Sequence, residues 1–129
     1  FSGKYDKKTM QKKLRGNGGL RAYLNTVDAR EVEKMIKDGD EKARIIYEAM
    51  AYQVAKGIGE LATVVDGEVD AIILTGGIAY SHMMVSWIKK RVKFLAPVEV
   101  MPGENEMESL AYGTLRVLKG EEAAREYTE

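Results

Sequence analysis

One segment constrains the fold of this chain more than any other: residues 69–81, which read VDAIILTGGIAYS. Residues 69–74 are an almost unbroken apolar run rich in β-branched side chains, which is typical of a strand covered on both faces. Gly76 and Gly77 follow, and because they lack a Cβ they let the backbone turn sharply and approach a ligand closely. A helical pattern then begins near Ser81. Parallel α/β sheets bind nucleotides with this order of strand, glycine loop and helix. The alternative is a tight turn that holds no ligand.

The composition excludes several classes of function. Lysine plus arginine and aspartate plus glutamate number 20 each among 129 residues, so the chain offers no broad basic field for nucleic acid and no polybasic tract for a membrane. It has no cysteine, which excludes disulfides and thiolate metal sites. The sequence contains no 18-residue apolar run and no signal-peptide pattern, and we therefore expect a cytoplasmic protein. The first residue is Phe1 and strand candidates are few, which suggests a piece of a longer polypeptide.

The hydrophobic periodicity predicts an α/β domain that occupies residues 1–129. In chain order we expect helices over residues 4–15, 28–39, 41–65, 81–94 and from 105, strands over 69–74 and 98–101, and a short extended piece over 20–24. A helix between the two strands is a crossover, so the strands should form a parallel pair.

The longest predicted helix, residues 41–65, carries two lines of apolar side chains. Large residues form one line and small residues form its neighbour: Ile46, Met50, Val54, Ile58, Leu61 and Val65, beside Ala51, Ala55, Gly59 and Ala62. Gly57 and Gly59 weaken a helix by roughly 1 kcal/mol each relative to alanine. Close packing against a sheet or a second helix is the compensation we expect.

Helix starts outside the glycine loop supply further candidate residues. Asp28 is followed three residues later by Glu31, which predicts a capping box, and Asn105 and Glu108 repeat that pattern. Arg30 is either a solvated side chain behind the cap or a planar guanidinium that braces a purine ring.

Acidic residues follow the second predicted strand. Glu104 and Glu106 either hold Mg²⁺ through water or suit the positive end of the next helix. His82 is the only histidine, and we expect it to be exposed. We expect the aromatic side chains to serve packing, except for Tyr80, which lies inside the glycine loop. That loop is neither a Rossmann fingerprint nor a P-loop, so a nucleotide would bind through close backbone approach and the helix N-terminus.

In combination, four segments resemble the acetate and butyrate kinase (acetokinase) family. They are residues 28–33 (DAREVE), 48–62 (EAMAYQVAKGIGELA), 70–81 (DAIILTGGIAYS) and 94–122 (FLAPVEVMPGENEMESLAYGTLRVLKGEE). The resemblance implies part of the C-terminal, ribonuclease-H-like domain of this actin-like ATPase superfamily. In that domain parallel strands are flanked by helices, and the nucleotide lies between two domains. Ala79-Tyr80-Ser81 stands where acetate kinases have Gly-Glu-Asn, which favours the butyrate branch.

The resemblance also implies roles for particular residues. Asp28, Ala29 and Arg30 are similar to the segment that lies along the adenine, and Gly76, Gly77, Ile78, Ala79, Tyr80 and Ser81 to an adenosine-binding motif. Glu104 or Glu106 is similar to the acidic position near Mg²⁺, although acetate kinases carry Thr-Asn-Glu-Glu where this chain has Gly-Glu-Asn-Glu.

The function implied is that of the adenosine-binding half of a short-chain carboxylate kinase. The parent would convert ATP and butyrate into ADP and butyryl phosphate, with Mg²⁺, and would form a homo-oligomer. The phosphate loops, the acid pocket and the catalytic residues would lie outside this chain, so we expect the chain alone to be inactive. The alternatives are a non-catalytic nucleotide-binding or self-association module, or a kinase for acetate, propionate or isobutyrate.

Overall fold

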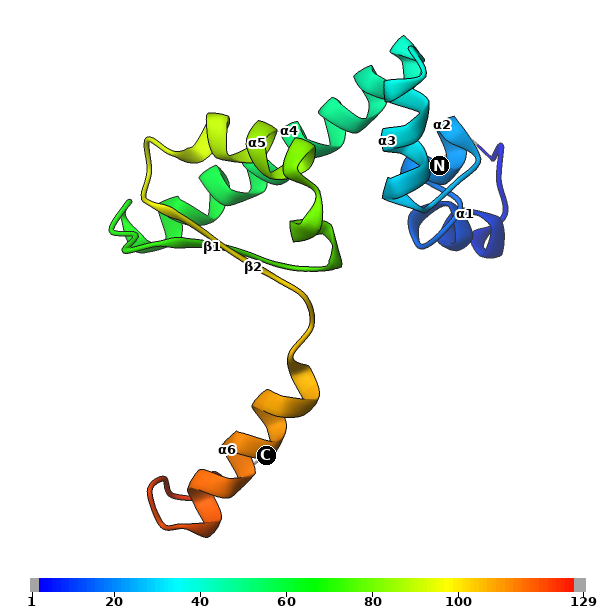
Figure 1. Cartoon of the computed structure of the whole chain (residues 1–129). Helices are drawn as coiled ribbons and strands as arrows, with labels where there is room; N and C mark the ends of the chain where they lie inside the picture. Colours follow the sequence, from blue (N-terminus) through cyan, green and yellow to red (C-terminus); the bar gives the residue numbers. More distant parts are fainter. Residues whose placement is uncertain (1–2, 127–129) are drawn as a thin grey trace.

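The computed structural model describes residues 3–126, and helices dominate it (Figure 1). Six α-helices lie in this part of the chain: α1 (Lys7–Leu14), α2 (Gly19–Leu24), α3 (Ala29–Lys37), α4 (Glu41–Ala62), α5 (His82–Val92) and α6 (Glu106–Leu118). Two short 3₁₀ helices, η1 (Thr63–Val65) and η2 (Gly77–Tyr80), and two strands, β1 (Ile72–Gly76) and β2 (Val98–Pro102), complete it. The two strands flanked by helices confirm the predicted α/β class.

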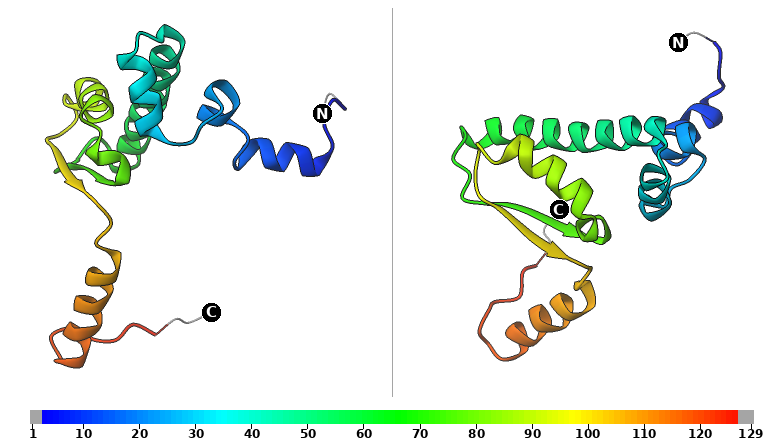
Figure 2. Two further views of the ribbon diagram at one scale, coloured as in Figure 1. Left: turned by 45° about the vertical axis from the view of Figure 1, so that its right-hand side comes forward. Right: turned by 45° about the horizontal axis from the view of Figure 1, so that its top comes forward.

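The sheet is a parallel pair, as the sequence predicts. β1 pairs with β2 in a register that runs from Ile72 opposite Val98 to Gly76 opposite Pro102. Helix α5 is the crossover between the strands, and Figure 2 shows it lying alongside α4. The carboxyl ends of both strands therefore meet at one edge. The glycine loop (residues 76–81) and the loop over residues 103–105, called the acidic loop below, both begin there.

The core lies between α4, α5 and the sheet. Tyr47, Met84, Val32 and Val92 are its largest fully buried side chains. On α4 the buried residues are mostly alanines: Ala43, Ala51, Ala55 and Ala62, beside Tyr47. Small side chains let α4 and α5 approach closely, and burial of the α5 face of Met84, Ile88 and Val92 supplies the apolar area.

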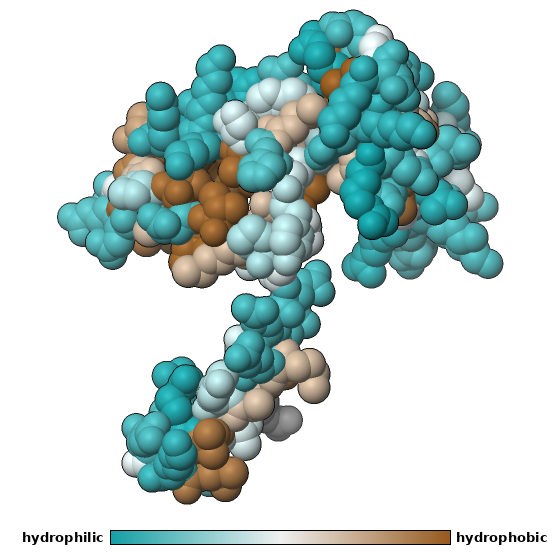
Figure 3. All heavy atoms as spheres, in the orientation of Figure 1, coloured by the Kyte–Doolittle hydropathy of each residue, from teal (hydrophilic) through white to brown (hydrophobic). Residues whose placement is uncertain are grey.

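The line of large residues on α4 is only partly covered. Val54, Leu61 and Val65 are exposed, and an apolar groove of about 690 Å³ runs between α4, β1 and α5. Figure 3 shows hydrophobic side chains gathered on the part of the molecule that α4, α5 and the two strands form. The expectation that close packing compensates for Gly57 and Gly59 is wrong within residues 3–126, because a Cβ added at either would meet nothing within 4 Å.

Three local predictions are also wrong. Residues 20–24 belong to helix α2, because Leu20 and Leu24 stand one turn apart and both pack against the core. The capping box at Asp28 does not close, since the Glu31 carboxylate accepts a hydrogen bond from the Thr26 hydroxyl instead. Asn105 makes no side-chain cap at the start of α6.

Helix α6 stands apart from the rest of the molecule (Figures 1 and 2). None of its residues is buried, so the predicted inward face is exposed here: Met107, Leu110, Ala111, Leu115 and Leu118. Its amphipathic pattern is helical as predicted, but no described element covers the apolar side.

Candidate functional site

A cleft of about 500 Å³ lies between the start of α3 and the glycine loop. Its lining comes from two segments far apart in the sequence: Asp28, Ala29, Arg30 and Glu33, and Gly77, Ile78, Tyr80 and Ser81. Seven of these eight residues are among the positions for which the sequence suggests adenosine contact. The fold thus gathers them around one space of a size suited to a small ligand.

Two of the suggested positions do not line the cleft. Gly76 ends β1 with φ 79° and ψ −176°, a conformation that is essentially restricted to glycine. Ala79 is only 5% exposed and anchors the loop in the body of the molecule. Both residues set the conformation of the loop without facing the cleft. Ile78 and Tyr80, on either side of Ala79, are exposed.

Gly77 differs from Gly76 in what it requires. Its φ is not positive, and a Cβ built on it would meet nothing within 4 Å. The backbone conformation therefore does not require a glycine at residue 77. The missing side chain instead leaves free space on the wall of the cleft.

The opposite wall begins with a cap and an ion pair. The Asp28 carboxylate accepts the Arg30 backbone N–H at 2.9 Å, and the Arg30 guanidinium doubles back onto it, with Nη2 2.6 Å from Oδ2. These hydrogen bonds lower the pKa of Asp28 to about 2, and the guanidinium has a larger effect than the backbone N–H. The Arg30 side chain is 91% exposed, so its planar group is fixed at one end and open to a ligand.

Glu33 is the lining residue that the sequence reasoning missed. Its Oε1 accepts hydrogen bonds from the Ser81 hydroxyl and from the Tyr47 hydroxyl, the latter at 3.2 Å. Ser81 also caps α5, because its Oγ accepts the Met84 backbone N–H at 3.0 Å. Burial is the largest of the effects that raise the pKa of Tyr47. Glu33 stands one turn after Ala29 on α3, and that spacing is the signal that places it on the same wall.

The acidic loop lies next to the glycine loop but forms no metal cage. Gly76 and Gly103 exchange backbone hydrogen bonds of 3.2 Å, which fixes the two loops side by side. Glu104 and Glu106 are exposed, and residues 3–126 contain no group of three His, Cys, Asp or Glu side chains placed to hold a metal ion. His82 is exposed, as expected.

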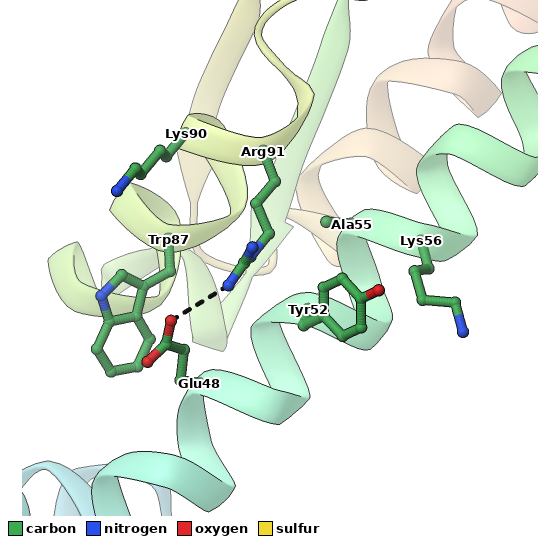
Figure 4. A pocket seen from close by; sticks show the side chains of 7 residues that line it. All are labelled: Glu48, Tyr52, Ala55, Lys56, Trp87, Lys90 and Arg91. Atoms are coloured by element: carbon green, nitrogen blue, oxygen red, sulfur yellow. Dashed lines mark hydrogen bonds and ion pairs between the residues drawn. The ribbon is translucent and has the colours of Figure 1, made fainter.

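A second cavity, of about 530 Å³, lies between α4 and α5 (Figure 4). There Arg91 pairs with Glu48 at 3.2 Å and lies over the Tyr52 ring, 5.1 Å from its centroid. Trp87 also lines this cavity, and its ring packs edge-on against Tyr47 with centroids 5.9 Å apart. The sequence reasoning did not single out this cavity, and most of its polar groups already have partners within the chain.

The fold is a partial ribonuclease-H-like α/β domain, with parallel strands flanked by helices and a glycine loop at the strand ends. A model of the acetokinase family matches residues 5–121, which is most of the chain. The chain belongs to the acetokinase family.

Comparison with curated proteins finds a similar sequence in Clostridium acetobutylicum. The chain is 53% identical over 127 residues to its butyrate kinase 2, and the match covers 98% of the chain. It covers only 36% of that relative, so the chain spans about a third of the length of the relative. Separately, none of the helices within residues 3–126 is both long and apolar enough to cross a membrane.

Proposed function

We propose that this chain supplies the adenosine-binding half of a short-chain carboxylate kinase, with ATP as the phosphoryl donor. The observation that carries the proposal is the single cleft that residues 28–30 line on one wall and Gly77, Ile78, Tyr80 and Ser81 line on the other. Membership of the acetokinase family and the similarity to a butyrate kinase support the choice of reaction.

The two walls of the cleft suit the two faces of a nucleoside. The Arg30 guanidinium is planar and exposed, so it can stack on a purine ring. Opposite it, Gly77 carries no side chain, and the ribose can approach the backbone there. The phosphates would then extend toward the carboxyl ends of β1 and β2, where parallel α/β folds place such groups.

Mg²⁺ would accompany the nucleotide rather than occupy a site built by protein alone. This ion is commonly held by one or two carboxylates together with substrate phosphates and water. Glu104 and Glu106 follow β2, beside the glycine loop, and fit that limited role. In the reaction the ion would reduce the charge repulsion between the two anionic substrates.

The proposed reaction depends little on acid–base catalysis. A carboxylate acceptor is ionised near neutral pH and needs no general base, so alignment and charge neutralisation supply most of the rate. The cleft positions only the adenosine end of ATP. We therefore expect the isolated chain to bind ATP weakly and to form no acyl phosphate.

Butyrate is the acceptor that we propose for the intact protein, since the curated relative is a butyrate kinase. Acetate, propionate and isobutyrate are the alternatives within the same reaction class. We also propose a cytoplasmic location and assembly as a homo-oligomer.

A non-catalytic self-association module is the second candidate function. The observation that favours it is the amount of exposed apolar surface, with Ile73 58% and Leu61 69% exposed. Sedimentation of the chain with and without ATP separates the two candidates. Concentration-dependent dimers with no response to ATP would favour the module.

The decisive test of the main proposal is titration of the ¹⁵N-labelled chain with ATP and Mg²⁺ at millimolar concentrations. We expect amide shifts confined to residues 28–33 and 77–81. Shifts centred on the second cavity, near Arg91, or no shifts at all would refute the proposed site. A phosphorylation assay with butyrate run beside it should give no product, and robust turnover would refute the claim that further segments are required.

A further inference from the structure

Glu33 lies on the wall of the proposed adenosine cleft, and only one of its two carboxylate oxygens is occupied. Oε1 takes the hydrogen bonds from Ser81 and Tyr47. Oε2 accepts no hydrogen bond from any residue within 3–126, and it is not a buried, unsatisfied atom. The free oxygen is therefore open to solvent and to a ligand in the cleft.

The carboxylate is held in a fixed orientation. Tyr47 is fully buried, and its ring contact with Trp87 leaves the hydroxyl little freedom. That hydroxyl lies 3.2 Å from Glu33 Oε1 and 3.4 Å from Ser81 Oγ, and its one proton is better placed on the charged acceptor. Ser81 is fixed in turn by capping α5. Two anchored donors thus hold Oε1 and set the direction of Oε2.

The charges of the neighbouring residues leave Glu33 as the unpaired carboxylate of the cleft. Asp28, the other acidic lining residue, is bound to Arg30 on both of its oxygens. Glu33 has no ion-pair partner within residues 3–126. A carboxylate accepts hydrogen bonds and donates none, so this wall favours a ligand edge that carries N–H donors.

The position of Glu33 along the cleft indicates which part of a nucleotide meets it. Gly77 lies at the strand end of the glycine loop, and Ser81 lies at its helix end. Glu33 is bonded to Ser81, away from the strand ends toward which the phosphates extend. The base, rather than the ribose or the phosphates, should therefore reach Glu33.

We propose that Glu33 is a specificity-determining residue that accepts a hydrogen bond from the 6-amino group of a purine. This inference rests on the proposed nucleotide function and specifies it further. A 6-oxo purine presents an acceptor at the same position, and two acceptors facing each other lose the hydrogen bond and repel. The cleft would thereby distinguish ATP from inosine triphosphate (ITP).

The test compares the binding of ATP and ITP to the 129-residue chain by titration. We expect the wild-type chain to bind ATP about tenfold more tightly, the difference typical of one hydrogen bond to a charged group. In Glu33→Gln the amide oxygen still accepts from Ser81 and Tyr47, while the amide nitrogen can donate to a 6-oxo group. The preference should then fall to about twofold or less.

Glu31→Gln is the matched control, because it makes the same charge change on α3 at a residue that does not line the cleft. It should keep the tenfold preference, and a merely structural role for Glu33 would alter both affinities together without changing their ratio. Equal binding of ATP and ITP by the wild-type chain, or an unchanged ratio in Glu33→Gln, would overturn the inference and leave the nucleotide site standing. No binding of either nucleotide would overturn the proposed function and the inference with it.

Discussion

Gly76 and Gly103 donate their backbone N–H groups to each other's carbonyl oxygens, at 3.2 Å in both directions. These two bonds join the loop after β1 to the loop after β2. A Cβ on Gly103 would also lie 3.0 Å from the Tyr80 hydroxyl oxygen. The Tyr80 side chain of the glycine loop therefore packs against the backbone of the acidic loop.

Gly103→Ala should therefore lower stability and displace Tyr80. The residue has φ 104°, where an L side chain is strained, and the new methyl group would lie 3.0 Å from the Tyr80 hydroxyl oxygen. We expect a loss of about 1–3 kcal/mol in the free energy of unfolding. Urea denaturation measures it, with Gly113→Ala on α6 as the control, because residue 113 has open space around it. Equal stabilities of the two variants would contradict the described loop contact.

Substitution by alanine should have different effects at Gly76 and at Gly77. Gly76→Ala should destabilise the chain by about 1–3 kcal/mol, because φ 79° and ψ −176° are essentially restricted to glycine. Gly77→Ala should leave the unfolding midpoint nearly unchanged, since its Cβ has free space. It should nevertheless weaken ATP binding severalfold, because the proposal places the ribose in that space. Denaturation and ATP titration of both variants check this, and a Gly77→Ala chain with wild-type affinity would count against the proposed pose.

Helix α4 should gain stability from alanine at two positions. Gly57 and Gly59 lie within α4 and have no neighbour within 4 Å of an added Cβ, so Gly57→Ala and Gly59→Ala remove the helix penalty without a clash. Each should raise the stability of this chain by about 1 kcal/mol. Ala51→Gly, at a fully buried position of the same helix, should lower it. A thermal melt of the three variants tests the described packing, and a loss of stability in the first two would contradict it.

The cap of α3 predicts a dependence on pH. The folded pKa of Asp28 is about 2, below its ordinary value of 3.8, so ionised Asp28 stabilises the fold above about pH 4. That contribution is lost as the pH falls through about 2. A ¹³C titration of the Asp28 carboxyl group should show the low midpoint, and Arg30→Gln should raise it toward the ordinary value. A midpoint near 3.8 in the wild-type chain would contradict the guanidinium hydrogen bonds.

Local patterns predicted most of the elements, whereas the two walls of the cleft were implied by the resemblance to the acetokinase family. The periodicity of α4 and α5, the cap at Asp28 and the strand that leads into the glycine loop follow from neighbours within a few positions, and the structure contains all of them. The parallel pairing follows from the length of the crossover, which is also a local property.

The features that were missed depend on contacts between distant segments. The sequence contains a line of large residues on α4 beside a line of small ones, but it does not indicate which line meets α5. In the structure alanines such as Ala51 and Ala55 occupy that interface. Glu33 and Ser81 are 48 positions apart, and no spacing rule indicates that they share a hydrogen bond. Gly76 and Gly77 cannot be told apart from the sequence. The backbone angles show that Gly76 is needed for its positive φ, whereas Gly77 has an ordinary φ and open space beside it.

Binding of adenosine in the cleft between α3 and the glycine loop is tested by intermolecular nuclear Overhauser effects between ATP and the ¹³C-labelled chain. We expect contacts from the adenine and ribose protons to the methyl groups of Ala29 and Ile78, which line opposite walls of the cleft. Contacts to Trp87 in the second cavity, or no contact to either methyl group at saturating ATP, would show that adenosine does not bind in this cleft.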